Sequence, residues 1–320
     1  MATVETVQGP VDAGDLGTVC IHEHVLFRDE GVAANWPTRY DPEHLRTEAV
    51  NAVNATKEHG VSTIVEPTAM FGGRDIGFLR RVAEETGINL VACTGIYTYD
   101  HLPHYFENRD ADAMADHFVE DIERGIEGTD AKAGFLKCAA DLPGVTENVE
   151  KVHRAVARAS LQTGAPIMAH SAPAANTGPR QVEIFLEEGV APEKIQIAHC
   201  GDTGDVGYIE GLIDKGVWVG LDRYGLNMFL PWDERQNTAA ALIEKGHAHR
   251  IFMGADFCAT IDWFPEEAVE GLVGGGLVME DWSMTLVFEK AVPELRERGV
   301  FDDATFNQVF VENPRAWLTA

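Results

Sequence analysis

Eight short runs of apolar, β-branched residues recur along this 320-residue chain, and segments with helical patterns separate them. Uninterrupted alternation of strands and helices is typical of α/β proteins with a parallel sheet. The candidate strands are Thr18–Ile21, Val61–Val65, Asn89–Thr94, Ala133–Lys137, Pro166–Ala169, Ile195–Ala198, Val217–Leu221 and Ile251–Met253.

The segments between the runs carry signals for helix starts and ends. Asp41-Pro42 supplies an N-cap with proline at the first helical position, and Gly60 follows that segment. Residues 147–163 place apolar side chains on one face, and Gly164 follows as a helix terminator. The apolar residues of that face are Val149, Val152, Val156 and Ala159. Further helical segments end at Gly189, Gly216 and Gly246.

Eight β-α units in succession favour a closed (β/α)8 TIM barrel, formed by residues 1–320 as a single domain, over an open doubly wound sheet. In such a barrel the reactive side chains lie at the carboxyl ends of the strands. Polar residues should therefore stand where the apolar runs stop, and they do. The candidate metal ligands at these positions are His22, His24, Lys137, His170, His199 and Asp256.

The first of these positions holds a His-x-His pair. Alternate side chains of a strand point to the same face, so His22 and His24 can share one metal ion while Glu23 points away. The spacing alone is a weak signal, because His247-Ala248-His249 has the same spacing. That second pair follows a helix and Gly246, so we interpret it as a solvated loop.

Four imidazoles and one carboxylate suit zinc or another first-row divalent ion, with cobalt, iron and manganese as alternatives. Five protein ligands exceed what one tetrahedral metal uses, and a second metal would require a bridging anion. No second carboxylate ends the fourth run, where Lys137 stands instead. Residue types alone favour a lysine that extends out of the barrel mouth or has a lowered pKa.

The complete set of candidate ligands resembles that of the phosphotriesterase family within the amidohydrolase superfamily, and in particular its phosphotriesterase-like lactonases. The resemblance extends over essentially the whole chain. The supporting stretches are Ile21-His22-Glu23-His24, Gly95-Ile96-Tyr97, Lys132 to Lys137, Gly201-Asp202-Thr203, Gly220 to Gly225, Thr260-Ile261-Asp262-Trp263 and Glu312-Asn313-Pro314-Arg315.

This resemblance implies a binuclear metal site. It implies that Lys137 is N-carboxylated and bridges two divalent ions, which removes the difficulty of its positive charge. It also implies which ligands hold each ion: His22, His24 and Asp256 hold the more buried one, and His170 and His199 the more exposed one.

A hydroxide between two such ions would attack an ester carbonyl or a phosphoryl centre, and Asp256 would carry the proton to the leaving alkoxide. The resemblance to lactonases assigns substrate contacts to Tyr97 and Arg223, and Arg223 would also orient Asp202. The alternatives are that Tyr97 only packs and that Arg223 only forms an ion pair. Ala255 replaces a histidine that many lactonase relatives carry before the aspartate, which predicts altered tuning rather than lost activity.

The segment from Cys258 to about Met279 is apolar and contains Gly274-Gly275-Gly276, which favours a mobile lid. With Cys258 and Trp263 as substrate contacts, such a lid suits an acyl chain beside a polar ring. N-acyl-homoserine lactones fit this description, so quorum quenching is the expected role. The alternatives are a subunit interface or a segment that merely tolerates insertion.

Composition restricts the partners. Acidic residues outnumber basic ones by 52 to 25, and the net charge of −27 disfavours nucleic acid and anionic membranes as partners. No run reaches the roughly 20 apolar residues of a membrane span. The N-terminus does not resemble a secretory signal, so we expect a cytoplasmic protein. The five cysteines are widely spaced and include no Cys-x-x-Cys pair, which indicates small buried residues.

The sequence therefore predicts a lactonase with weaker phosphotriesterase activity toward organophosphates, acting on a small lactone or ester. A dedicated phosphotriesterase or esterase is the alternative enzyme. A non-catalytic metal-binding barrel is the alternative from another class. The resemblance also implies a homodimer.

Overall fold

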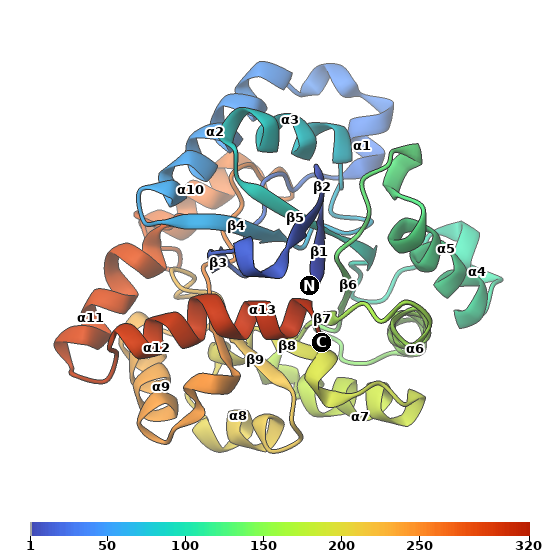
Figure 1. Ribbon diagram of the computed structural model, residues 1–320. Coiled ribbons are helices and arrows are strands. Elements are labelled where there is room, and N and C mark those ends of the chain that lie inside the picture. The colour runs from blue at the N-terminus through green and yellow to red at the C-terminus, as the bar shows by residue number, and fades with distance from the viewer. Residues whose placement is uncertain (1) are drawn as a thin grey trace.

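The computed structural model describes residues 2–320 and contains an eight-stranded parallel barrel (Figure 1). The strands pair in the order in which they occur along the chain, which excludes the doubly wound alternative. Helices surround the barrel, so the predicted (β/α)8 architecture is confirmed. The barrel strands are β3 (Thr18–Cys20), β4 (Val61–Glu66), β5 (Asn89–Ile96), β6 (Phe135–Ala139), β7 (Ile167–His170), β8 (Ile195–Ala198), β9 (Trp218–Leu221) and β10 (Ile251–Met253).

The barrel closes between its first and last strands through the segments that follow them. The backbone N–H of His24 donates to the carbonyl of Phe257 at 2.7 Å, and that of Asp256 donates to the carbonyl of His22 at 3.1 Å. The N–H of Ala259 donates to the carbonyl of His24 at 2.9 Å. The backbone that closes the barrel therefore also carries three of the predicted metal ligands.

Helix boundaries follow the predicted capping signals. The Asp41 carboxylate accepts hydrogen bonds from the backbone N–H groups of Glu43 and His44 at the start of α2. Gly164 ends α6 with φ of 81°, a conformation that glycine adopts without strain. Among the described residues, no helix has both the length and the apolar character that a membrane span needs. The helices are α1 (Glu30–Asn35), α2 (Pro42–Lys57), α3 (Ile76–Thr86), α4 (His104–Glu107), α5 (Ala111–Glu123), α6 (Glu147–Thr163), α7 (Thr177–Glu188), α8 (Val206–Ile213), α9 (Trp232–Glu244), α10 (Glu266–Gly274), α11 (Val292–Glu297), α12 (Asp303–Asn307) and α13 (Asn313–Leu318).

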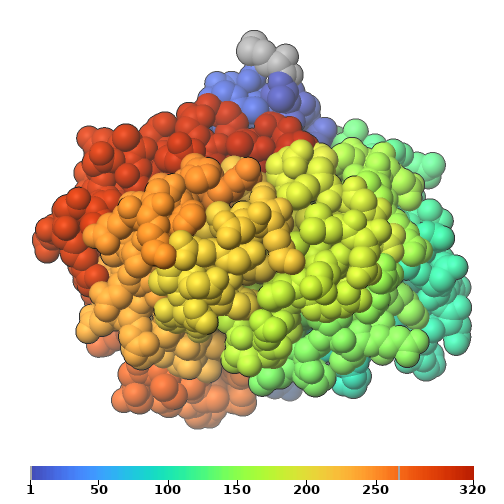
Figure 2. Space-filling model, turned by 90° about the horizontal axis from the view of Figure 1, so that it is seen from below, coloured from blue at the N-terminus to red at the C-terminus, as the bar shows by residue number. Residues whose placement is uncertain are grey.

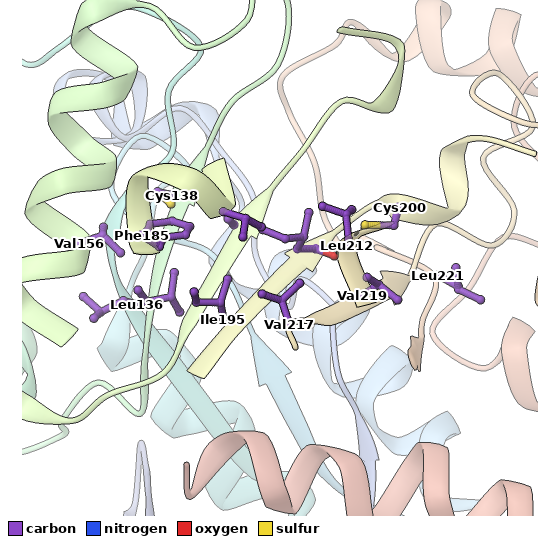
Figure 3. Packing of buried hydrophobic residues seen from close by; sticks show 14 of the residues in the cluster. Leu136, Cys138, Val156, Phe185, Ile195, Cys200, Leu212, Val217, Val219 and Leu221 are labelled. Carbon is purple, nitrogen blue, oxygen red and sulfur yellow. Dashed lines mark hydrogen bonds between the residues drawn. The ribbon is translucent and has the colours of Figure 1, made fainter. Parts of the chain in front are cut away.

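Two layers of apolar side chains hold the barrel together. Alternate residues of the strands point outward against the surrounding helices, as Figure 3 shows for strand residues Leu136, Ile195 and Val219 and for Phe185 of α7. The other strand residues fill the barrel interior. The four apolar residues predicted for one face of α6 are all fully buried. The outer layer fixes the helices, and the inner layer supports the metal-binding end from below.

The two ends of the barrel differ. A hairpin of β1 (Thr3–Thr6) and β2 (Gly9–Asp12) and the C-terminal helix α13 lie at the amino end of the strands (Figure 1). Trp317 of α13 packs 5.6 Å from the ring of Phe135 inside the barrel. In Figure 2 the hairpin, in blue, projects at one end of the molecule and the segment after β10, in dark orange, lies at the other. The amino end is therefore plugged, and the carboxyl end is left for chemistry.

The segment after β10, which the sequence predicted to be a mobile lid, contains the helix α10. The glycines end this helix, and Gly276 takes a left-handed φ of 69° while Leu277 bonds back to the carbonyl of Leu272. The glycine run is thus a helix terminator.

The cysteines follow the prediction of small buried residues, with one exception. All five thiols are free, and Cys258 alone among them is partly exposed.

One buried histidine lies outside the candidate ligand set. His153 of α6 donates from Nδ1 to the carbonyl of Val149 at 2.7 Å, and its Nε2 lies 2.9 Å from the Gln181 amide nitrogen. Nε2 therefore accepts a hydrogen bond and carries no proton. Burial lowers the pKa of His153 from 6.5 to about 4.

Acid should therefore destabilise the fold through His153. Between pH 6.5 and about 4, His153 is protonated in the unfolded chain and neutral in the folded protein. The free energy of unfolding therefore falls as the pH falls through this window. Urea unfolding at pH 7 and pH 5 should show that the wild type loses about 2 kcal/mol more than His153→Gln. Equal losses in the two proteins would contradict this assignment.

Candidate metal centre

The six predicted ligands converge at the carboxyl end of the barrel from five different strands. His22 and His24 follow β3, His170 ends β7, His199 follows β8 and Asp256 follows β10. The sixth, Lys137, lies in the middle of β6, because this strand begins and ends two residues later than predicted. His199 and Asp256 both adopt left-handed backbone conformations, with φ of 65° and 50°, as the chain turns out of the strand.

Asp256 lies at the centre of the group. Its Oδ1 is 3.3 Å from Nε2 of His22 and 3.2 Å from Nε2 of His24, and its Oδ2 is 3.8 Å from Nε2 of His199. The Nζ of Lys137 lies 3.1 Å from Nε2 of His22. His22, His199 and Asp256 can each offer a ligand atom within 4.8 Å of the others, which is a spacing that could hold a metal ion.

His170 packs against His199, another of the candidate ligands, and their ring centroids lie 4.5 Å apart. Its Nε2 lies 2.8 Å from Oδ2 of Asp141, so Nδ1 is the nitrogen left free for a metal ion. Both rings are about as deeply buried as those of His22 and His24. Burial of the ligands therefore does not separate a more exposed metal position from a more buried one.

A buried carboxylate behind the histidines sets their protonation. Oδ2 of Asp222 lies 2.9 Å from Nδ1 of His22, and Oδ1 lies 3.0 Å from Nδ1 of His199. Burial alone would raise the pKa of Asp222, but the two imidazoles hold it well below its usual range. An ionised carboxylate only accepts hydrogen bonds, so both histidines carry their proton on Nδ1 and leave Nε2 bare.

The same tautomer follows for His24. Its Nδ1 lies 2.6 Å from the hydroxyl of Thr68, and that hydroxyl donates to the buried carboxylate of Glu66 at 2.5 Å. Having donated its proton, the Thr68 oxygen must accept from His24. Nε2 of His24 is therefore also bare.

Bare nitrogens facing a carboxylate fit a bound cation. Nε2 of His22 and of His24 both point their lone pairs at Oδ1 of Asp256, whose Oδ2 accepts a hydrogen bond from the guanidinium of Arg223. Burial lowers the pKa of His22, so protonating the ring is an unfavourable way to relieve this repulsion. A divalent metal ion between these atoms would satisfy all of them.

Lys137 is buried and lies within the group. Its Nζ contacts Nε2 of His22 at 3.1 Å and the sulfur of Met168 at 3.4 Å. Burial lowers the pKa of Lys137 below its ordinary value. Because the side chain is 1% exposed, the amine does not extend out of the barrel mouth, which excludes one of the interpretations left open by the sequence.

Glu23 points away from the metal group, as predicted. Its two carboxylate oxygens accept hydrogen bonds from the backbone N–H groups of Ala255 at 2.8 Å and Phe257 at 2.9 Å. The carbonyl of Ala255 accepts from the indole of Trp282 at 2.9 Å. Glu23 therefore holds the backbone on both sides of Asp256.

Arg223 connects Asp256 to a second carboxylate. Its Nε donates to Oδ2 of Asp256 at 2.9 Å and a terminal nitrogen donates to Asp202 at 3.0 Å. Asp202 also accepts from Arg235 at 3.0 Å. The side chain of Arg223 stacks over Phe229, 4.4 Å from the ring centroid, which orients the guanidinium plane. The predicted contact between Arg223 and Asp202 is present.

Aromatic side chains lie along one edge of the set of candidate metal ligands. Tyr97 lies 5.3 Å from the ring of His170, and Trp263 packs 4.6 Å from Phe27 and 5.7 Å from Tyr97. Tyr97 and Trp263 also line a cavity of about 530 Å³ beside the metal group. Cys258 does not line this cavity, and its backbone forms a β-bridge with that of His24.

The second His-x-His pair lies apart from the centre. His247 and His249 fall in a short 3-10 helix rather than the predicted loop. Nε2 of His247 contacts Glu210 at 2.8 Å, and Nδ1 of His249 bonds the carbonyl of Gly246 at 2.9 Å. Position at a strand end, rather than spacing, therefore separates the two pairs.

Sequence reasoning missed the residues behind the ligands. Each of these residues lies within hydrogen-bond distance of the ring nitrogen that a histidine does not offer to a metal ion, and no role was predicted for any of them. They are Asp222, Asp141 and Thr68. Asp222 follows a predicted strand directly, and that position was the one available signal. Its pairing with His22 and His199 depends on the folded barrel.

Comparisons with known proteins agree with this geometry. The family model described as "Phosphotriesterase family" matches residues 2–318. An aryldialkylphosphatase of Saccharolobus solfataricus is 46% identical over 97% of both chains, and a phosphotriesterase homology protein of Mycobacterium tuberculosis is 40% identical over 98% of this chain and 97% of its own. A solved structure of the phosphotriesterase from M. tuberculosis superposes with a TM-score of 0.93 at 38% identity, covering 99% of this chain and 98% of that one.

Proposed function

This chain belongs to the phosphotriesterase family and is a hydrolase of that family, and we propose that it opens lactone rings, with N-acyl-homoserine lactones as substrates and phosphotriesters as secondary substrates. The observation that carries the proposal is that Tyr97 and Arg223 both contact the candidate ligands, Tyr97 at His170 and Arg223 at Asp256. The Tyr97 hydroxyl lies 3.4 Å from His170, and Arg223 bonds Asp256. The carbonyl oxygen of a bound ester could thus accept a hydrogen bond from Tyr97. The leaving-group oxygen of that ester would face the carboxylate of Asp256.

We propose two divalent ions, zinc first, in this site. His22, His24 and Asp256 would hold one ion, and His170 and His199 the other. When bound, the ions would supply a nucleophilic hydroxide near neutral pH and a Lewis acid for the substrate oxygen. Quorum quenching would be the biological role.

Lys137 would bridge the ions as an N-carboxylated side chain. The burial that lowers the pKa of Lys137 favours its uncharged amine, and only that form can attack carbon dioxide. The new N–C bond forms as the amine loses a proton, and the product is a carboxylate. The neutral Lys137 amine beside His22 would then become a carboxylate. This carboxylate would be the second anionic ligand that the site otherwise lacks.

The chain's own residues would position the substrate and move the proton. Asp256 is ionised and would accept the proton of the attacking nucleophile and deliver it to the leaving alkoxide. Arg223 bonds the carboxylates of both Asp256 and Asp202, and it would orient Asp202 for a proton relay from the site. Tyr97 would donate its hydroxyl proton to the carbonyl oxygen.

The cavity beside Tyr97 supports a substrate with an apolar tail. Phe71, Leu142, Pro143 and Trp263 contribute apolar surface to this space of about 530 Å³. A fatty acyl group fits such a lining better than a charged one does. Cys258 and Trp263 would form the substrate contacts on the side of β10.

A dedicated phosphotriesterase is the second candidate. The 46% identity to the Saccharolobus aryldialkylphosphatase favours this candidate. Both reactions would use the same ligands, so the ratio of the two specificity constants separates them. A barrel that binds metal without catalysis is the remaining alternative.

Turnover of a homoserine-lactone series of rising acyl length, with metal content measured on the same sample, tests the proposal. We expect ring opening that depends on chain length, about two ions per chain, and loss of activity on chelation. His247→Ala is the matched control and should keep both activity and metal content. Two bound ions without lactone opening would move the assignment to phosphotriesters or to a binding role, and turnover without metal would refute the mechanism.

We also propose that residues 1–320 act as one catalytic domain, that the protein is a homodimer and that it works in the cytoplasm. Light scattering on the purified protein would test the dimer directly.

A further inference from the structure

Two tyrosine hydroxyls meet at the edge of the metal group. Tyr97 and Tyr99 follow β5 with one residue between them, and their phenol oxygens lie 2.7 Å apart. Their rings pack edge to face at 5.5 Å. The backbone N–H of Tyr97 donates to the carbonyl of Met70 at 3.0 Å, which fixes where the segment begins. The pair therefore belongs to the folded site, although Tyr99 is 37% exposed.

The direction of the hydrogen bond between them follows from the next partner. The Tyr97 hydroxyl also lies 3.4 Å from Nδ1 of His170, whose Nε2 faces the carboxylate of Asp141 at 2.8 Å. Because that carboxylate only accepts, Nε2 carries the proton and Nδ1 is a bare acceptor. Tyr97 therefore donates toward His170, and it can only accept from Tyr99.

Both phenols keep their protons. An unperturbed phenol has a pKa of about 10, so each hydroxyl has one proton to donate near neutral pH. The Tyr99 proton lies between the two phenol oxygens. The Tyr97 proton points toward the candidate metal ligands.

We infer that Tyr99 is a positioning residue, whose hydroxyl donates to Tyr97 and so directs the Tyr97 proton to the oxygen of the substrate carbonyl. The inference rests on the proposed lactonase function. A metal ion bound at Nδ1 of His170 would take away the acceptor of Tyr97, and the substrate oxygen would replace it. Donation from Tyr99 also polarises the Tyr97 O–H, which strengthens the bond it makes in turn.

A double-mutant cycle tests this inference. Tyr97→Phe, Tyr99→Phe and the double variant would be compared with the wild type in lactone turnover. Binding of a homoserine lactam would be measured by calorimetry on the same proteins, because the lactam keeps the carbonyl and resists opening. Tyr105→Phe is the matched control, since this tyrosine lies on α4 and is half exposed. Metal content would be determined for every variant.

We expect Tyr99→Phe to lower kcat about tenfold with little change in KM, because a bond to the carbonyl oxygen strengthens as negative charge develops there. Lactam binding should weaken about threefold. In the Tyr97→Phe background, Tyr99→Phe should change neither quantity, since the residue it acts through is gone.

Two results would overturn the inference: wild-type behaviour of Tyr99→Phe, or the same loss in both backgrounds, which would indicate a structural role. If the wild type opens no lactone, the proposed function fails, and the lactam cycle still decides the role of Tyr99. Absence of lactam binding as well would refute both.

Discussion

Replacing Lys137 with alanine should lower turnover by about a thousandfold, because it removes the side chain that we propose to bridge two ions beside His22. Lys137 is 1% exposed, and its Nζ lies 3.1 Å from Nε2 of His22. Metal content should fall from about two ions per chain to one or fewer. Added formate or acetate should restore part of the activity, since a free carboxylate can enter the space that the side chain leaves.

The matched control is Lys215→Ala, which removes an exposed lysine after α8. Lys137→Met fills the same volume without an amine and separates loss of the bridge from loss of packing. Circular dichroism should show the same fold for all three variants. Full turnover of Lys137→Ala would refute the binuclear proposal.

Replacing Asp222 with asparagine should weaken metal binding by about 10- to 100-fold without touching a ligand. Asp222 accepts hydrogen bonds from Nδ1 of both His22 and His199 and from the backbone N–H of His199 at 2.7 Å. An asparagine has only one accepting oxygen, so its amide would face the proton of one imidazole. That ring must then change tautomer or rotate, and its Nε2 is lost as a ligand.

Metal titration of the metal-free proteins measures this effect, with Asp233→Asn as the control at an exposed position in the first turn of α9. Loss of affinity with unchanged thermal stability of the metal-free form would support the assignment. Equal affinities would show that Asp222 only fills space.

The sequence predicted the fold because each barrel strand is a local pattern. Strands buried on both faces must be apolar throughout, and helices between them need caps that a few residues reveal. The ligands were found for a related reason. His22 was separable from His247 because one stands at a strand end and the other follows a helix.

The residues behind the ligands could not be found in this way. Asp222 and His22 are 200 residues apart, and nothing near either one indicates their contact. The close fit around Asp222 is equally hidden, since a side chain at Gly220 would place its first carbon 2.3 Å from the Asp222 carboxylate. Such pairings arise only when the barrel brings neighbouring strands together.

One strand boundary was misplaced and one helix was missed, both for physical reasons. Lys137 was expected at the end of its strand, but β6 continues to Ala139 because the following residues are also small and buried. The sequence did not predict α10, a helix that ends within the glycine run at 274–276. Glycine ends helices as readily as it loosens loops, so composition alone does not distinguish the two.

Closure of the barrel through the ligand-bearing segments has a consequence for how the protein is made. The Glu23 carboxylate accepts a hydrogen bond from the backbone of Ala255, which lies 232 residues later in the chain. The two sides of the contact that closes the barrel are therefore synthesised at very different times. No partial chain that ends before β10 can bring His22, His24 and Asp256 together. The ion that we propose at these three ligands could therefore be bound only after Asp256 has been synthesised, and it would then link the segment after the first strand to the segment after the last.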